Sequence, residues 1–338
     1  MEFSKILIRA TNWVGDAVMC LPALAAIRKR YPAARISILA KPWVADLYAR
    51  EKSVDDVIVY QSEARWKMIG QLRARRFDCA ILLQNAFEAA LIAWLARIPN
   101  RIGYNRDGRG LLLTRRVPPP LRGEIPRHER FYYLELLRRS GIIEALPDCD
   151  AIRLAPPPVE RKRIIGVSPG AAYGGAKRWL PERFAETALH LARERGASVA
   201  LFGSKAERAL CEEVAALLNG HPGVNYAGQT SLAQFIELAA SCELFLTNDS
   251  GAMHIASALG VPTVAIFGAT DDAATGPTGP LARVIREPVE CSPCLLRECP
   301  IDHRCMTRVT AGRVIQVAQA LVPLLLLIGK LWIPEARF

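Results

Sequence analysis

Residues 243–268 have the sequence ELFLTNDSGAMHIASALGVPTVAIFG, and this stretch decides the fold. An apolar run at 243–247 predicts a buried strand, and a second run at 264–267 predicts another. Between them, a polar turn leads into a helix of small residues that ends at Gly260 and Pro262. Strand, turn, helix and strand in this order indicate a parallel βαβ unit. The stretch therefore predicts an α/β fold.

The polar turn of this unit carries a candidate anion site. Asp249, Ser250 and Gly251 follow the first strand, and ligands of open parallel sheets bind at the carboxyl ends of strands. Free N–H groups at the helix start could hold a phosphate. His254, one turn further, could add a hydrogen bond or a positive charge. The alternative is structural, with Asp249 as a helix cap and His254 as a core residue.

The rest of the chain repeats the alternation of strand and helix in two blocks, which a proline-rich break at 155–158 separates. In the first block, strands are predicted at 4–9, 35–40, 56–60 and 79–83, and helices at 16–30, 43–50, 64–75 and 86–96. In the second, further strands are predicted at 164–168, 198–202 and 224–227, and helices at 182–195, 206–218 and 232–241. We expect two doubly wound, Rossmann-like domains, 1–155 and 156–338, facing each other across a cleft.

Composition limits the class of protein. The chain has 338 residues, of which 51% are hydrophobic, so it can bury a large core and global disorder is unexpected. No signal peptide is recognisable, and no segment reaches the roughly 18 apolar residues that span a bilayer. The nine cysteines are expected to be reduced thiols of a cytoplasmic protein. The apolar segment 314–328 predicts a helix packed across the domain interface or, alternatively, a membrane-facing element.

Positive charge is concentrated in the first half. Residues 1–155 carry a net charge of +10 and residues 156–338 only +1, and all ten basic residues within 101–139 are Arg. Arg suits bidentate contacts to phosphate or carboxylate, so Arg101, Arg106 and Arg109 are candidate contacts to an anionic acceptor. A phosphorylated substrate, an anionic membrane surface or nucleic acid would fit this charge, as would a solvated basic face. No basic motif interleaved with aromatic residues supports nucleic acid.

Three further features are candidate site residues. Asp16 opens the first predicted helix, either as a stabilising first-turn carboxylate or as a general base that the helix dipole keeps ionised. Residues 168–179, SPGAAYGGAKRW, form a small-residue loop whose Lys177 could neutralise a phosphate. Glu207 follows a strand and could accept hydrogen bonds from ribose hydroxyls. Alternatively, it serves only as a negative charge at a helix N-terminus. Neither a dinucleotide fingerprint nor a Walker A sequence is present.

Four cysteines gather near the C-terminus, with His303 among them. Cys291 and Cys294 have the spacing of thiolate zinc ligands, whereas the spacings to Cys299 and Cys305 are irregular. A structural zinc site and a reduced, thiol-rich loop are the two interpretations.

Together, NWVGDAVMCLPAL at 12–24, SPGAAYGGAKRW and TNDSGAMHIASALGVPTVAIFG resemble the ADP-heptose:lipopolysaccharide heptosyltransferases, glycosyltransferase family 9. The resemblance covers nearly the whole chain and is greatest to the members that add the second heptose. It implies a GT-B fold, with the acceptor bound by the first domain and ADP-heptose by the second. The implied reaction moves L-glycero-D-manno-heptose onto heptosyl-Kdo2-lipid A with inversion, without a required metal, at the cytoplasmic face of the inner membrane.

The resemblance also implies roles for single residues. Asp16 matches the family's catalytic aspartate, Lys177 its ADP-binding lysine, and Glu207 its ribose-side glutamate. The candidate donor-binding set is Ser168, Gly170, Lys177, Glu207, Thr230, Asp249, Ser250, Gly251 and His254. The loop 171–175 departs from the two-threonine phosphate stretch of the sister enzymes. Alternatives are another GT-B enzyme, such as a different heptosyltransferase or a sugar-nucleotide epimerase, and a non-catalytic nucleotide-sugar-binding protein.

Overall fold

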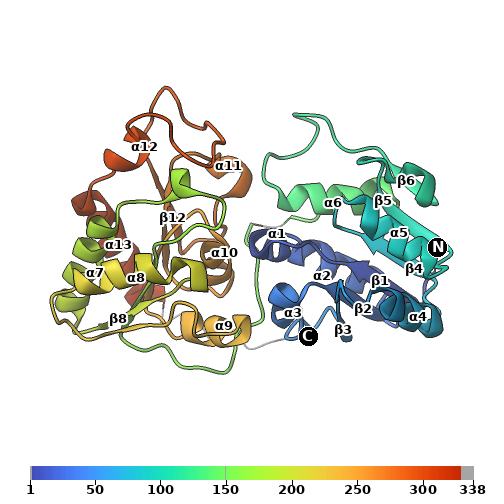
Figure 1. The fold of residues 1–338 in the computed structure, drawn as a ribbon, viewed down its shortest axis with the longest axis horizontal. Coiled ribbons are helices and arrows are strands. Elements are labelled where there is room, and N and C mark those ends of the chain that lie inside the picture. The colour runs from blue at the N-terminus through green and yellow to red at the C-terminus, as the bar shows by residue number, and fades with distance from the viewer. Residues whose placement is uncertain (1, 149, 329–338) are drawn as a thin grey trace. The chain divides into compact units, whose positions relative to one another are not determined.

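The computed structural model describes residues 2–148 and 150–328. The chain divides into two compact units, Met1–Ala155 and Pro156–Phe338. Each unit contains a six-stranded sheet whose neighbouring strands all run parallel (Figure 1). The predicted α/β class with two doubly wound sheets is therefore confirmed. In the described part of the chain, no helix combines the length and apolar character needed to cross a bilayer.

The first unit has the strand order β3-β2-β1-β4-β5-β6. Its elements are β1 (Lys5–Arg9), α1 (Val14–Met19), α2 (Leu21–Arg30), β2 (Arg35–Ala40), α3 (Pro42–Tyr48), β3 (Asp56–Val59), α4 (Arg65–Arg75), β4 (Cys79–Leu82), α5 (Phe87–Leu95), β5 (Asn100–Tyr104), η1 (Arg109–Leu112), β6 (Arg115–Val117) and α6 (Arg130–Arg139). The chain moves outward from β1 to β3 and then returns to β4 on the other side of β1. The topological switch point, where such sheets bind ligands, therefore lies between β1 and β4.

Both faces of this sheet are buried, as a parallel sheet between helices requires. Ile6 and Ile8 of β1 are fully buried on one face. Leu7 points to the other face, where it packs with Met68 of α4 and Ala90 of α5. This explains why β1 has a continuous apolar run rather than a polar alternation.

The second unit repeats the same plan with the order β12-β11-β10-β7-β8-β9, so its switch point lies between β7 and β10. Its elements are β7 (Ile164–Ser168), η2 (Gly175–Lys177), α7 (Pro181–Arg195), β8 (Ser198–Leu201), η3 (Lys205–Glu207), α8 (Arg208–Ala216), β9 (Gly223–Asn225), α9 (Leu232–Ala240), β10 (Leu244–Asn248), α10 (Gly251–Ala258), β11 (Thr263–Phe267), α11 (Asp272–Thr275), β12 (Ala282–Arg286), α12 (Arg304–Thr307) and α13 (Ala311–Ile328).

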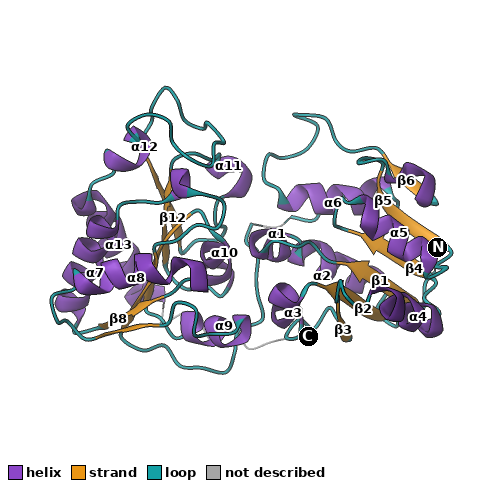
Figure 2. Cartoon of the chain, viewed as in Figure 1, coloured by secondary structure: helices purple, strands orange, loops and turns teal. Residues whose placement is uncertain are grey.

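Two helical layers cover this sheet (Figure 2). Leu244 and Leu246 of β10 belong to the core beneath α7, α8 and α13. Phe245, between them, faces the layer of α9 and α10 and stacks on Phe202 with ring centroids 5.7 Å apart. Strand β10 is therefore buried on both faces, which holds the polar turn after it in a fixed position.

Several boundaries differ from the sequence-based expectations. The predicted helix 16–30 is two helices, α1 and α2, which meet at Cys20. Pro22 lies in the first turn of α2, where its missing N–H costs no helical hydrogen bond. Strands β5, β6 and β12 and helix α6 were not predicted.

The C-terminal segment packs within the second unit. Val314, Ala318 and Leu321 of α13 are buried in the core of that unit. The side chains of 323–328 and all of 329–338 lie outside the described residues.

Candidate active site

Polar residues from both halves of the chain gather at the two switch points. In the second unit, β7 and β10 pair with Ser168 opposite Thr247, so the loops that carry Lys177 and Asp249 emerge side by side. In the first unit, β1 pairs with β4, and Asp16 lies in the helix that follows β1. Neighbouring strand ends bring these residues to the positions where open α/β sheets bind ligands.

Lys177 and Asp249 form a buried ion pair. The Lys177 Nζ lies 2.5 Å from Asp249 Oδ2, which also accepts a 2.5 Å hydrogen bond from the Thr270 hydroxyl. Their side chains are only 13% and 5% exposed. The N-cap of α10 is Ser250, so the alternative of Asp249 as a helix cap is wrong. An ammonium has three donors, so Lys177 keeps donors for an anionic ligand beside Asp249.

Asn248 holds the loop of Lys177 against β10. Its Oδ1 accepts a 2.9 Å hydrogen bond from the Trp179 backbone N–H, and its Nδ2 donates to the Pro169 carbonyl at 2.7 Å. Asn248 is fully buried, so these bonds replace hydration that the amide has lost. The two ends of the loop 168–179 are thereby tied to one side chain. This role of Asn248 was not predicted from the sequence, although Asn248 stands at a strand end beside Asp249.

The start of α10 meets the requirements of an anion site. Ser250 is its N-cap, and Gly251 begins its first turn, where backbone N–H groups have no partner within the helix. Ser250 Oγ lies 3.2 Å from Thr247 Oγ1 and makes no capping bond to the helix. His254 is 5% exposed, one turn into the helix.

Glu207 lies against the loop after β7. Its Oε2 accepts hydrogen bonds of 2.8 Å from both the backbone N–H and the hydroxyl of Ser204, so Glu207 does serve as a helix-start residue. A Cβ at Gly170 would collide with the same carboxylate. Gly170 therefore allows close approach of the β7 and β8 loops, and the Glu207 carboxylate faces that junction.

The cysteine-rich loop supports the loop of Lys177. Hydrogen bonds connect them: Tyr173 OH donates to the Leu295 carbonyl at 2.7 Å, the Ala176 N–H to the Arg297 carbonyl at 2.9 Å, and the Gly175 N–H to Glu298 Oε1 at 3.0 Å. The His303 ring Nε2 lies 3.1 Å from the Ala176 carbonyl oxygen. Lys177 Nζ also lies 4.7 Å from the centroid of the Tyr173 ring, within cation–π range. The small residues of the loop permit this close pairing of backbones.

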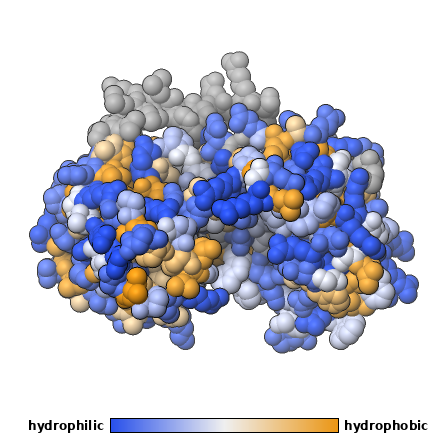
Figure 3. All heavy atoms as spheres, turned by 90° about the horizontal axis from the view of Figure 1, so that it is seen from above, coloured by the Kyte–Doolittle hydropathy of each residue, from blue (hydrophilic) through white to orange (hydrophobic). Residues whose placement is uncertain are grey.

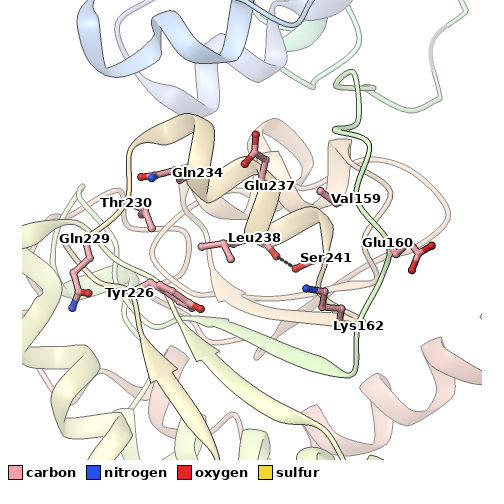
Figure 4. Close-up of a pocket in the computed structure, with 10 residues that line it drawn as sticks. All are labelled: Val159, Glu160, Lys162, Tyr226, Gln229, Thr230, Gln234, Glu237, Leu238 and Ser241. Atoms are coloured by element: carbon pink, nitrogen blue, oxygen red, sulfur yellow. Dashed lines mark hydrogen bonds between the residues drawn. The ribbon is translucent and has the colours of Figure 1, made fainter.

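A groove of about 670 Å³ runs along α9 (Figure 4). It is lined by Val159, Glu160, Lys162, Tyr226, Gln229, Thr230, Gln234, Glu237, Leu238 and Ser241. Thr230, a predicted donor contact, therefore lies in this groove, whereas Lys177 and Asp249 do not line it. The groove and the ion pair have no residue in common.

In the first unit, Asp16 is half-buried in the first turn of α1. Its Oδ1 accepts a 3.1 Å hydrogen bond from the Tyr133 hydroxyl of α6. Burial raises the pKa of Asp16, and the Tyr133 hydrogen bond lowers it in part. The sequence-based expectation of a pKa depressed by the helix dipole is therefore wrong. A raised pKa brings a carboxylate closer to the range that suits a general base.

The three candidate arginines have different positions. Arg109 is fully buried and bonds Asn85 Oδ1 at 2.7 Å and the Tyr104 carbonyl at 2.8 Å, so it is a structural residue and not an acceptor contact. Arg101 lies near the amino end of β5, whereas Asp16 follows the carboxyl end of the parallel strand β1. The Arg101 guanidinium donates to nearby backbone carbonyls, including that of Leu112. Arg106 follows the carboxyl end of β5 and alone remains suitable for an acceptor anion.

Sequence comparison identifies the family of this chain. A model of glycosyltransferase family 9 (heptosyltransferase) matches residues 65–304. The chain belongs to this family.

Relatives of this family 9 member have similar length. The chain is 34% identical to lipopolysaccharide heptosyltransferase 2 of Salmonella typhimurium and to that of Escherichia coli, in each case over 83% of this chain and 88% of the relative. Among solved structures, E. coli ADP-heptose lipopolysaccharide heptosyltransferase II matches with a TM-score of 0.80 and 31% identity, covering 95% of this chain and 99% of the other. The two Rossmann-like units thus represent the GT-B fold.

In this family 9 chain, Cys291, Cys294 and Cys299 lie in the loop before α12, and Cys305 lies in α12. Cys291, Cys294, Cys299 and Cys305 are free thiols, and within residues 2–148 and 150–328 no cluster of three or more His, Cys, Asp or Glu side chains could hold a metal ion. Burial and, to a smaller extent, the charges of the neighbouring thiols raise the pKa of Cys305 to about 11.

Proposed function

We propose that this chain transfers L-glycero-D-manno-heptose from ADP-heptose to heptosyl-Kdo2-lipid A, the second heptose addition of the lipopolysaccharide inner core. The observation that carries this proposal is the close similarity to heptosyltransferases 2 over most of the chain. Charged and polar groups at the switch points, Asp16 in one unit and the Lys177–Asp249 pair in the other, supply chemistry suited to this reaction.

We assign the donor to the second unit, 156–338. The diphosphate of ADP-heptose would lie at the start of α10, where Ser250 and Gly251 offer backbone N–H groups and Lys177 offers positive charge. The Glu207 carboxylate would accept hydrogen bonds from the ribose hydroxyls. Other residues proposed to line the donor site are Ser168, Gly170, Thr230 and His254. A cation and a helix start can together stabilise the leaving diphosphate, so we expect no required metal.

The first unit, 1–155, would bind the acceptor. Asp16 would accept the proton of the attacking hydroxyl as the new bond to the anomeric carbon forms. The hydroxyl would attack from the face opposite ADP, so the anomeric configuration inverts. Of the three candidate arginines, Arg106 is the one that we propose contacts the anionic groups of the acceptor.

We also propose a peripheral contact with the cytoplasmic face of the inner membrane, supported by the net charge of +10 on residues 1–155. On the face in Figure 3, hydrophobic residues form small groups among hydrophilic ones. Co-sedimentation with anionic vesicles, and its loss with zwitterionic vesicles or at high salt, would support the contact. Equal binding to both vesicle types would oppose it.

The decisive experiment measures transfer from ADP-heptose to two purified acceptors, Kdo2-lipid A and heptosyl-Kdo2-lipid A. We expect product only with the acceptor that already carries one heptose, and unchanged turnover after treatment with a chelator. Product with the heptose-free acceptor would assign a different heptosyltransferase. ADP-heptose binding without turnover of either acceptor would favour a non-catalytic binding protein.

A further inference from the structure

The carboxyl edge of the first sheet carries two exposed tryptophans. Trp13 follows β1 and is 62% exposed, and Trp43 follows the neighbouring strand β2 and is 57% exposed. Trp13 is the N-cap of α1, Trp43 lies in the first turn of α3, and these two helices pack together (Figure 1). An indole is a large apolar group, so two of them left in water forgo the free energy of burial. Such a pair is typical of a surface that binds a ligand.

The loop between β1 and α1 is held by two hydrogen bonds to Asn12. Trp43 Nε1 donates to the Asn12 backbone carbonyl at 2.8 Å, and Arg9 Nη2 donates to the Asn12 side-chain oxygen at 3.2 Å. Arg9 is only 2% exposed, so its position is fixed by packing. Trp43 is therefore oriented by its own hydrogen bond, and the same bond ties down the loop that carries Trp13. Side chains that are already oriented lose little conformational freedom when they bind.

Asp16 lies beside this loop. The Trp13 carbonyl accepts the first hydrogen bond of α1, from the Ala17 N–H at 2.9 Å. Asp16 is the third helical residue, a position whose side chain lies back toward the N-cap, as the capping box illustrates. The proposed base and the Trp13 indole are thus neighbours at the start of one helix, at the switch point of the first sheet.

A lysine lies at the same edge. Lys41 follows the last residue of β2, and its Nζ lies 3.7 Å from the Tyr60 ring centroid and 5.8 Å from the Trp43 ring centroid, within cation–π range. Glu88 accepts the Tyr60 hydroxyl at 2.7 Å and is paired with Arg65 at 2.8 Å. In the described part of the chain, no carboxylate forms an ion pair with Lys41. Aromatic faces hold an ammonium without neutralising it, so Lys41 keeps positive charge for an anionic ligand.

We propose that Trp13 and Trp43 form a stacking surface for the sugar rings of the acceptor and that Lys41 binds an anionic group, a carboxylate or a phosphate, of the same saccharide. The inference rests on the proposed function and names the part of the first unit that holds the acceptor beside Asp16. The apolar C–H face of a sugar packs on an indole while the hydroxyls at its rim stay hydrated.

The spacing of the strands suits this ligand. Neighbouring strands lie about 4.8 Å apart, so residues that follow β1 and β2 can contact adjacent sugar residues of one chain. A saccharide whose hydroxyl meets Asp16 and which continues along the ends of these strands passes Trp13 and Trp43 and reaches Lys41. Tryptophan also suits a lipid–water interface. The position of the indoles beside the proposed base favours the saccharide, and the experiment below separates the two.

The first test uses full-length protein and deacylated heptosyl-Kdo2-lipid A, a water-soluble saccharide without acyl chains. Trp13→Ala should raise both its calorimetric Kd and its KM about tenfold, and Trp13→Phe should restore most of the affinity, because stacking needs an aromatic face. The donor KM should stay nearly unchanged. Trp94→Ala is the matched control, since Trp94 is 49% exposed but lies in the last turn of α5, toward the amino edge of the sheet. It should change neither value.

The second test identifies the anion. Lys41→Gln should raise the Kd of the deacylated saccharide about tenfold, the effect of losing a charged hydrogen bond. The measurement is repeated with a carboxyl-reduced saccharide and with a dephosphorylated one. The derivative that lacks the group bound by Lys41 should have the same Kd for the wild type and for Lys41→Gln. A tenfold difference that persists with both derivatives, or no difference with the parent saccharide, would overturn the role of Lys41.

The remaining outcomes concern the stacking surface. Unchanged saccharide affinity in Trp13→Ala and Trp43→Ala, both shown to be folded by thermal denaturation, would overturn it. So would a wild type that does not bind the deacylated saccharide, or an effect confined to the acylated acceptor in vesicles, which would assign the indoles to the lipid interface. If the saccharide binds through these tryptophans but receives no heptose from ADP-heptose, the stacking surface stands and the proposed reaction is wrong.

Discussion

Lys177 and Asp249 connect the two loops at the switch point of the second sheet through a buried ion pair of 2.5 Å. The pair joins residues that are far apart in the sequence because β7 and β10 are neighbours in the sheet. Thr270 donates to the same carboxylate oxygen, so Asp249 holds the lysine in place at the start of α10. The arrangement presents a positive group, already oriented, where a diphosphate would bind.

Removal of the lysine tests this arrangement. Lys177→Ala should weaken ADP affinity by about 1.5–3 kcal/mol, the contribution of a charged hydrogen bond. It should also lower the free energy of unfolding, because Asp249 remains buried without its partner. Calorimetry with ADP and thermal denaturation measure the two effects separately. Arg208→Ala is the control, since it breaks an exposed ion pair with Glu212. An unchanged ADP dissociation constant would remove Lys177 from the donor site.

The two hydrogen bonds by which Asn248 holds both ends of the loop 168–179 give a second prediction. Asn248→Ala leaves the Trp179 N–H and the Pro169 carbonyl without partners, so the free energy of unfolding should fall by roughly 2–4 kcal/mol. ADP affinity should fall as well, because the loop that carries Lys177 loosens. Asn248→Asp keeps the acceptor for Trp179 but loses the donor to Pro169, and it places a buried carboxylate oxygen against that carbonyl, so this variant should be destabilised as well. Equal stability of the wild type and Asn248→Ala would contradict this role of Asn248 in holding the loop.

The catalytic assignment of Asp16 is tested by an isosteric change. Asn cannot accept the acceptor proton as a carboxylate does, so Asp16→Asn should lower kcat by at least about 10²-fold. ADP-heptose affinity should stay within a few-fold, since the proposed donor contacts lie in the other unit. Thermal denaturation must show a folded variant for the comparison to hold. Near-normal turnover by folded Asp16→Asn would end the assignment.

Two arginines in neighbouring positions should behave differently. Arg106→Ala should raise the acceptor KM and leave the donor KM nearly unchanged, and added salt should reproduce part of this effect through screening. Arg109→Ala should instead lower the melting temperature, because a fully buried, hydrogen-bonded guanidinium is lost. Steady-state kinetics with each substrate varied, together with calorimetric melting, separate the two outcomes. A selective acceptor effect from Arg109 without loss of stability would contradict its structural role.

The sequence by itself determined the fold class and the approximate place of the site. Continuous apolar runs such as residues 244–246 predict strands because a parallel sheet is buried on both faces. Alternation with helices then predicts the doubly wound plan, and polar residues after strands predict where ligands bind. Asp16, Lys177 and Asp249 were therefore recognisable as strand-end residues. Local periodicity carries this information because it depends only on neighbours along the chain.

Only the tertiary structure decided which of these residues contact each other. Asp16 and Tyr133 are 117 residues apart, and their hydrogen bond depends on how α6 packs beside the first switch point. The role of Asp249 as an ion-pair partner depends on β7 lying next to β10, which composition does not specify. Arg109 looked like an available cation, but its guanidinium is enclosed by the carbonyls of other segments. Burial and pairing are properties of the packed sheet order, so they, and the pKa direction of Asp16, follow from the structure.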